Sequence, residues 1–431
     1  MREFFTKFLK GALWIVRRTV GLFSPYVTSF ERKVGKFFRR IRSTTAEATV
    51  QRGLLELMDE NLIVVNLWME TKYKGYKYLT KRTRRRLYEN VEKFVSVFKK
   101  ESSGGAPSVE HIGKILQKKG LSFPTGDEEK LLYLFQIMDF LRPGRYYRYL
   151  KTASFSKLLA DPTRETLEGD CNQIVTLYAY LYSLKFPLSD LRIKLLPEHV
   201  CLHFRGIDIE ATNATFHNYK EDYQILPITE IISTNLLDLA DFREEVRQIN
   251  PRDMVKSSQL AYAISSLKEL VTKNLNIAYR NLAISAMRSK NFKTAIYYFS
   301  KVGDRKSLQA AYHNAAVHYL KSNNFSRARY YASRSGNKDL ERNIRRNEGV
   351  HYYKNNRVEK ALKVFRSLGD RDMERACYQK QYNDLARRVS SVRTLDDARK
   401  HRSTYRKMLD IAVKIGDSRL QRGVRETLDK L

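Results

Sequence analysis

The chain has 431 residues, of which 42% are hydrophobic and 12% aromatic, and this composition excludes an intrinsically disordered protein. The presence of only three cysteines excludes a disulfide-stapled secreted fold and favours free thiols in the cytoplasm. The net charge of +33 is uneven, because residues 1–100 and 251–431 carry excesses of 14 and 23 positive charges while residues 101–250 carry an excess of 4 negative charges.

This division of charge predicts a central part enclosed by two basic flanks. Basic flanks are typical of proteins that meet an anionic partner, although solubility alone would also account for them. We predict three parts: a basic helical N-terminal region over residues 1–101, an α+β domain over 109–250 and a helical repeat domain over 276–431.

The N-terminal segment MREFFTKFLKGALWIVRR mixes aromatic and basic residues at helical spacing. Its longest apolar run, Ala12 to Val16, is far shorter than the roughly 20 residues that span a bilayer. The arginines that follow it also speak against a secretory signal. We expect an amphipathic basic helix, which suits either peripheral attachment to an anionic membrane surface or packing on the protein's own core. Helix is predicted to continue over residues 45–100.

The stretch SSGGAPS at residues 102–108 is the clearest linker in the chain. A helical segment is predicted after it, over residues 109–160, with a turn at RPGR, residues 142–145. The next helix is apolar and starts in EGDCNQIV, where Cys171 directly follows Asp170. Asp is a good N-cap, and the peptide N–H groups at a helix start favour a thiolate. Cys171 is therefore a candidate nucleophile.

Three strands are predicted after this helix, over residues 191–196, 198–204 and 207–212, with a tight hairpin turn at Arg205-Gly206. With that turn, alternate residues of the middle strand share one face and lie opposite acidic or hydroxyl residues of the last strand. The opposed pairs are His199 with Thr212, Cys201 with Glu210, and His203 with Asp208. Glu210 is then also a diagonal neighbour of His199, within reach of its imidazole.

A helix-borne cysteine, a strand-borne histidine and an acid on the next strand follow the order of papain-like and transglutaminase-like cysteine enzymes. The chain resembles the transglutaminase-like superfamily over residues 164–235, and the matching motifs are Gly169-Asp170-Cys171, His199 in PEHV, and Glu210-Ala211-Thr212 in place of Asp-Pro-Thr. The resemblance implies that Cys171 is the nucleophile, His199 the base and Glu210 the residue that orients the imidazole, with Asp208 as the fallback. It implies acyl chemistry on an amide, by hydrolysis or transfer, without a cofactor or a metal.

Two other interpretations use the same residues. Alternate positions of a strand share a face, so a metal site is one alternative, lined by His199, Cys201, His203 and Asp208. In the other alternative the cysteines are small buried apolar residues and the histidines are hydrogen-bonded structural groups.

The last part of the chain repeats with a period of 33 residues, seen in the sets Asn281, Asn314 and Asn347; Ala295, Ala328 and Ala361; Gly303, Gly336 and Gly369. A constant period predicts stacked helix pairs. The pattern resembles the tetratricopeptide repeat, which implies two helices per repeat and a curved groove. We expect six helices over residues 276–377, with the alanines buried and the glycines as left-handed caps. The glycine-containing end of the second helix of each repeat recurs in AVKIGD at residues 412–417, which indicates a degenerate last repeat.

The repeats carry no catalytic pattern, so we expect them to bind a partner, and their positive charge favours an acidic protein or peptide in the groove. Arg280, His313 and Arg346 occupy equivalent places on the first-helix face and are candidate contacts. No Gly-rich phosphate loop, zinc finger or RNA-binding motif is present, so nucleic acid is favoured by charge alone. The sequence thus predicts a mainly α protein with a small α+β unit, either a cysteine enzyme that recruits its substrate through the repeats or a scaffold with an inactive transglutaminase-like module.

Overall fold

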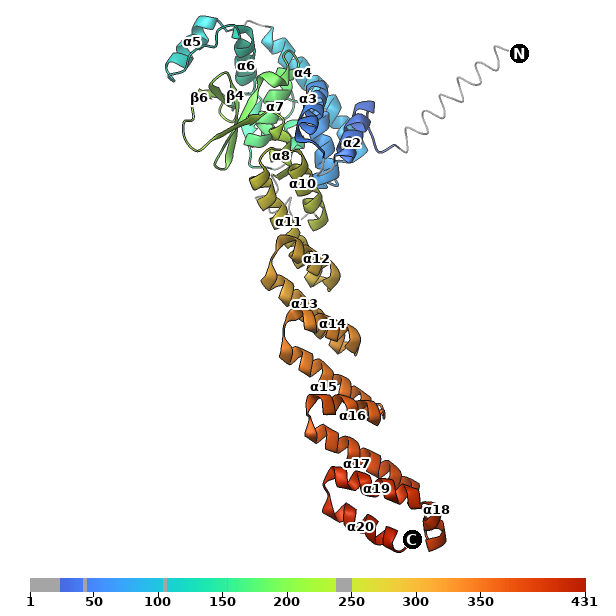
Figure 1. The fold of residues 1–431 in the computed structure, drawn as a ribbon. Helices are drawn as coiled ribbons and strands as arrows, with labels where there is room; N and C mark the ends of the chain where they lie inside the picture. Colours follow the sequence, from blue (N-terminus) through green and yellow to red (C-terminus); the bar gives the residue numbers. More distant parts are fainter. Residues whose placement is uncertain (1–23, 42–44, 104–106, 153, 238–249) are drawn as a thin grey trace, which may run out of the picture. The chain divides into compact units, whose positions relative to one another are not determined.

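The computed structural model describes residues 24–41, 45–103, 107–152, 154–237 and 250–431. The protein is mainly helical and contains a small antiparallel sheet, as the sequence predicts. It divides into two compact units, residues 1–282 and 283–431, which are described separately below (Figure 1). The predicted N-terminal amphipathic helix and part of the predicted linker lie outside the described residues. Among the described helices, none is long and apolar enough to cross a membrane.

The first unit combines helices with the sheet. Its helices are Ser29–Arg40 (α2), Glu47–Met69 (α3), Lys81–Ser102 (α4), Val109–Gln117 (α5), Glu128–Phe140 (α6), Cys171–Ser183 (α7), Glu230–Leu237 (α8), Pro251–Ile264 (α10) and Lys268–Arg288 (α11), the last of which continues into the second unit. A short π-helix, Glu70–Lys74 (η1), extends α3, and Phe155–Leu158 (η2) and Leu188–Asp190 (η3) are 3-10 turns.

The helical segment predicted over residues 109–160 is interrupted over residues 118–127, between α5 and α6, and ends at Phe140, just before the predicted turn at residues 142–145. Pro143 follows shortly after, and a proline cannot donate the backbone hydrogen bond that a helix interior requires. The chain instead turns into Tyr147–Tyr149 (β1), which pairs in parallel with Leu167–Gly169 (β2).

The predicted boundary at residues 102–108 does not separate two domains. Buried residues of α2, α3 and α4 belong to the same hydrophobic core as those of α6, α7 and the main sheet. The described parts of residues 1–101 and 109–250 therefore form one unit, because their apolar faces cover one another.

The main sheet has five strands in the order β6-β5-β4-β3-β7. Its strands are Arg192–Leu196 (β3), His199–Phe204 (β4), Ile207–Glu210 (β5), Thr215–His217 (β6) and Gln224–Pro227 (β7). The predicted hairpin register is confirmed, since His203 pairs with Asp208 and Phe204 with Ile207. Both turn residues have positive φ, +49° at Arg205 and +85° at Gly206, as a two-residue type I′ turn requires.

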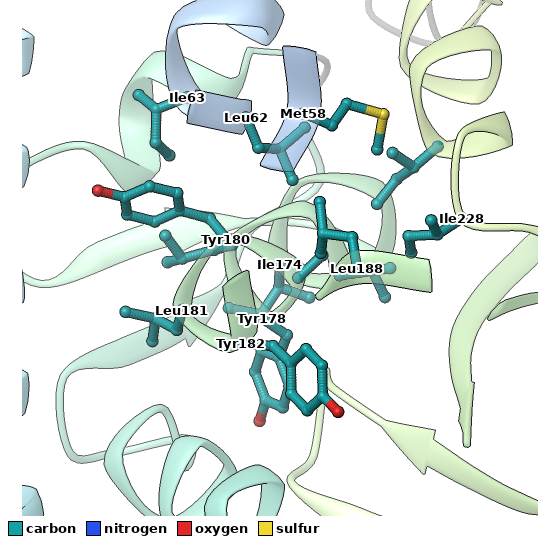
Figure 2. Close-up of a cluster of buried hydrophobic side chains, with 14 of the residues drawn as sticks. Met58, Leu62, Ile63, Ile174, Tyr178, Tyr180, Leu181, Tyr182, Leu188 and Ile228 are labelled. Carbon is teal, nitrogen blue, oxygen red and sulfur yellow. The ribbon is translucent and has the colours of Figure 1, made fainter. Parts of the chain in front are cut away.

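Helix α7 lies between the sheet and α3 and is buried from Gln173 to Tyr182 (Figure 1). Figure 2 shows its side chains packed with residues of α3, and the labelled α7 residues are Ile174, Tyr178, Tyr180, Leu181 and Tyr182. Each fully buried apolar side chain of this size contributes about 1.5–3 kcal/mol relative to an exposed one. This packing fixes α7, and with it the position of Cys171 at its first turn.

The second unit is entirely helical. It contains the end of α11 and then Phe292–Val302 (α12), Arg305–Lys321 (α13), Phe325–Ser335 (α14), Lys338–Lys354 (α15), Val358–Leu368 (α16), Arg371–Arg388 (α17), Leu395–Lys400 (α18), Arg402–Ile415 (α19) and Ser418–Asp429 (α20). The six helices predicted over residues 276–377 are α11 to α16, and α17 begins inside that range. Residues 250–431 are described without a gap and contain no strand.

The 33-residue period of the sequence is also a period of the structure. Ala295, Ala328 and Ala361 are fully buried in α12, α14 and α16. The glycines that cap these three helices have φ between +67° and +71°, the left-handed conformation that the sequence predicts. The turn inside each pair also uses one left-handed residue, at the equivalent positions Lys290, Asn323 and Asn356.

Candidate active site

Cys171 is the first residue of α7, and the residues around it form a helix cap. One carboxylate oxygen of Asp170 accepts hydrogen bonds from the backbone N–H groups of Asn172 at 3.1 Å and Gln173 at 3.5 Å. The Gln173 side chain accepts in return from the N–H of Asp170 at 3.3 Å. This capping box confirms the predicted N-cap and holds Cys171 at the positive end of the helix.

The strand before Cys171 approaches its neighbours closely. A Cβ atom at Gly169 would lie 2.9 Å from the side chain of Leu158, which is tighter than atoms in folded proteins pack. The hydroxyl of Tyr147 donates to the carbonyl oxygen of Gly169 at 2.9 Å. The glycine of the Gly-Asp-Cys motif is therefore needed to seat β2 under η2.

His199 opens β4 and is held by Glu210 of β5. Its Nε2 lies 2.6 Å from Oε2 of Glu210, whose side chain is 3% exposed. The other oxygen of Glu210 accepts from the backbone N–H and the hydroxyl of Thr212, at 3.3 and 2.7 Å. Burial alone would raise the pKa of Glu210, but the hydrogen bonds from His199 and Thr212 outweigh it and lower the pKa. Glu210 is thus an ionised acceptor that orients the imidazole.

The thiol of Cys171 is the second hydrogen-bond partner of His199. Hydrogen bonds first with Cys171 and then with Glu210 raise the pKa of His199 to about 10, against the opposing effect of burial. The imidazole is therefore protonated at neutral pH. Because its Nε2 faces Glu210, Nδ1 is the nitrogen left for the thiol. The fold brings together Cys171, His199 and Glu210, which are far apart in sequence.

The other two cysteines have different surroundings. Cys201 is buried, and its burial, together with the charges of Asp208 and Glu210, raises the pKa of its thiol far above the ordinary value. Burial likewise raises the pKa of Cys377 to about 11. All three thiols are free, but only Cys171 is partly exposed. Of the three, Cys171 is the one that a substrate can reach.

Asp208, the fallback acid, contacts other partners. Its carboxylate accepts from Nδ1 of His203, Nζ of Lys194 and the backbone N–H of Tyr219, each at 2.7 Å. These hydrogen bonds outweigh burial, which would raise the pKa of Asp208, and lower it. Asp208 and Lys194 are both buried. Asp208 therefore belongs to a second polar cluster, and it is Glu210 that holds His199.

The alternative metal site does not form. Within the described ranges of the chain, no group of three or more histidine, cysteine, aspartate or glutamate side chains is placed to hold a metal ion. His199 and His203 point to different carboxylates, those of Glu210 and Asp208, so the residues that share a face do not converge on one point.

Tyr219 links the two clusters and was missed in the sequence. Its hydroxyl donates to Oε2 of Glu210 at 3.1 Å, and this is the oxygen that also faces His199. Its backbone N–H donates to Asp208 and its carbonyl accepts from Nζ of Lys194 at 2.5 Å. Tyr219 lies beyond β6, where no strand pattern relates it to β4 or β5.

We expect Tyr219→Phe to slow alkylation of Cys171 by iodoacetamide about three- to tenfold at pH 7, because one hydrogen bond to a charged group is lost. With that donor removed, Glu210 and the imidazole it holds are less firmly fixed. The rate is measured by mass spectrometry of the Cys171 peptide. Tyr223→Phe is the matched control, since its ring lies over Lys194 and its hydroxyl makes no hydrogen bond among the described residues. Equal rates for wild type and Tyr219→Phe would show that Tyr219 does not support the site.

Neither the comparison with known protein families nor the comparison with curated proteins finds a match to this chain. The geometry of the site therefore carries the functional proposal.

Proposed function

We propose that the first unit is a transglutaminase-like cysteine enzyme that hydrolyses an amide or transfers its acyl group. The observation that carries this proposal is the hydrogen-bonded series from Cys171 through His199 to Glu210. The series joins a partly exposed thiol at a helix start, a protonated imidazole and a buried carboxylate, which is the arrangement that activates a cysteine nucleophile.

In the first step, Sγ of Cys171 attacks the amide carbonyl carbon and the imidazolium of His199 gives its proton to the leaving nitrogen. The C–N bond breaks, the amine leaves and a thioester remains on Cys171. In the second step, His199 takes a proton from water or from an amine as that group attacks the thioester, and Cys171 is released. Glu210 stays ionised and holds Nε2 throughout. The start of α7 supplies the positive end of a helix dipole, which stabilises the negative charge that develops on the carbonyl oxygen.

The turn between β3 and β4 borders a cavity of about 760 Å³. His199 is the first residue after this turn. Leu195, Leu196 and Pro197 line the cavity from the hairpin, while Cys171 and His199 lie outside its lining. We assign this cavity to parts of the substrate remote from the reacting amide. The 33-residue helix pairs, which we interpret as tetratricopeptide-like, recruit an acidic protein or peptide substrate. Free thiols suit the reducing cytoplasm.

The test is acylation by p-nitrophenyl acetate, a small activated ester that needs no natural substrate. We expect a burst of about one nitrophenolate per chain, with an acetyl group found only on the Cys171 peptide. The Cys201 and Cys377 peptides of the same digest are internal controls, because both thiols are buried. Cys171→Ser should abolish the burst. Absence of an acetyl group on Cys171 of the folded wild type would favour the non-catalytic scaffold.

A further inference from the structure

The second helices of the repeats have an unusual charge. α12 and α14 contain no aspartate or glutamate, and α16 contains one glutamate. The first helices differ among themselves: α13 also contains no acidic residue, whereas α15 and α17 contain three each. Some of these acidic residues meet cations, since Arg329 pairs with Glu348 at 2.6 Å and Arg346 with Asp370 at 2.8 Å. The second helices therefore carry positive charge with almost no acidic residue of their own, as α13 does.

A strip of exposed side chains follows these helices, and we call it the second-helix strip. It consists of Lys293, Tyr297 and Lys301 on α12, Arg327, Tyr330 and Arg334 on α14, and Lys360 and Lys363 on α16. Residues three or four apart share a helix face, so each group of side chains forms one patch. None of these six cations makes an ion pair within residues 250–431, which the structure describes without a gap. The positions Tyr297, Tyr330 and Lys363 are each 33 residues apart.

The two tyrosines of the strip are 55% and 51% exposed, which is high for residues of this type. Each ring nevertheless has a cation and another ring beside it. The guanidinium of Arg334 lies 3.8 Å from the ring centroid of Tyr330, and the ring of Tyr331 packs against it edge-on at 5.0 Å. Tyr297 repeats the arrangement with Lys301 and Tyr298. Each ring holds a cation in place, which reduces the entropy lost when that cation binds an anion.

We propose that the second-helix strip is a docking surface for an acidic segment of a polypeptide. The strip offers ammonium, guanidinium and phenol hydroxyl donors in successive repeats, which match carboxylates along an extended chain. A single-stranded nucleic acid would gain most from stacking its bases on open aromatic rings. Because a cation and a neighbouring ring already lie against each of Tyr297 and Tyr330, less of each ring is left for a base to stack on, and carboxylates fit the strip better than bases.

This inference deepens the proposed recruitment by the repeats and moves it to a different face. Of the first-helix candidates, Arg346 is already paired with Asp370, and His313 is half-buried. Arg280 also makes contacts within the fold. Docking on the strip requires no chemistry at Cys171, so a failure of binding and a failure of acylation are separate results.

The experiment uses the full chain and a fluorescein-labelled peptide of about 12 residues, mostly glutamate, followed by fluorescence anisotropy. The strip variant carries Lys301→Gln, Arg327→Gln and Arg334→Gln. The control variant carries Arg305→Gln, Lys306→Gln and Lys321→Gln, which remove the same charge from exposed positions of α13. We expect the strip variant to bind the peptide about tenfold more weakly at about 100 mM salt, and the control variant to change the affinity less than about twofold.

The outcomes divide clearly. Equal losses of affinity in the two variants would show that the peptide binds by non-specific electrostatic attraction and would contradict the proposed docking surface. Tighter binding of a single-stranded oligonucleotide with the same number of charges, lost in the strip variant alone, would overturn the acidic polypeptide in favour of nucleic acid. Circular dichroism of both variants checks that the helices are intact.

Discussion

Iodoacetamide should modify Cys171 of the folded chain at pH 6.5 about tenfold faster than it modifies Cys171 of a His199→Ala variant. A lone thiol has a pKa near 8.5 and reacts slowly at pH 6.5 because about 1% of it is thiolate. In the wild type, the imidazolium of His199 lies beside Cys171, and a positive charge next to a thiol accelerates its alkylation. The rate is followed by mass spectrometry of the Cys171 peptide.

The pH dependence has a definite sign. Hydrogen bonds with Cys171 and Glu210 raise the pKa of His199 to about 10, so the imidazolium persists across the neutral range. The faster alkylation of the wild type relative to His199→Ala should therefore persist between about pH 6.5 and 9 and disappear as pH rises past about 10. His199 also stabilises the fold fully below about pH 6.5, and this contribution is lost as pH rises toward 10. Identical pH profiles for the two proteins would contradict the Cys171–His199 interaction.

Replacing Lys194 by methionine should lower the free energy of unfolding by about 3–5 kcal/mol. Lys194 and Asp208 are 3% and 1% exposed, and Nζ lies 2.7 Å from the carboxylate. Methionine fills similar space but removes the ammonium from the buried carboxylate of Asp208, which keeps only His203 and the N–H of Tyr219 as partners, and this loss costs far more than the ion pair itself contributes. Urea denaturation measures the change.

Arg192→Met is the matched control, since Arg192 lies two residues away on the same face of β3 and is exposed. Its effect should stay within about 0.5 kcal/mol. In the double variant Lys194→Met and Asp208→Asn, the buried charge is removed as well, so the loss should be smaller than the sum of the two single losses. A small effect of Lys194→Met would mean that Asp208 is already neutral or reaches water.

The residues of the candidate site could be found in the sequence because strand residues alternate between the two faces of a sheet at a fixed spacing. One turn, Arg205-Gly206, fixes the register of β4 against β5, and the register puts Glu210 within reach of His199. The strand register alone left Asp208 as an alternative acid to Glu210. Only the structure shows that Lys194, from the neighbouring strand, and Tyr219 occupy its oxygens.

Other features depend on contacts that have no local pattern. The Gly/Ser-rich stretch at residues 102–108 predicts a domain boundary, yet α4 and α6 on either side of it share one core through contacts such as Phe98 with Phe140. Local composition predicts where a linker lies, but it does not predict which apolar faces pack together. The repeats were the easier problem, because their period places Ala328 and Gly336 in equivalent surroundings in every copy.

The junctions of the helical array are nearly interchangeable. Each of the helices α12 to α16 packs chiefly on its neighbours in sequence, and each of the three pairs from α11 to α16 uses a left-handed residue for its inner turn and a glycine for its exit. Removing or duplicating one 33-residue repeat would therefore alter only the contacts at one interface between adjacent repeats. The length of the array is a quantity that gene duplication can tune without altering the candidate site at Cys171, and that an engineer can increase in steps of one repeat.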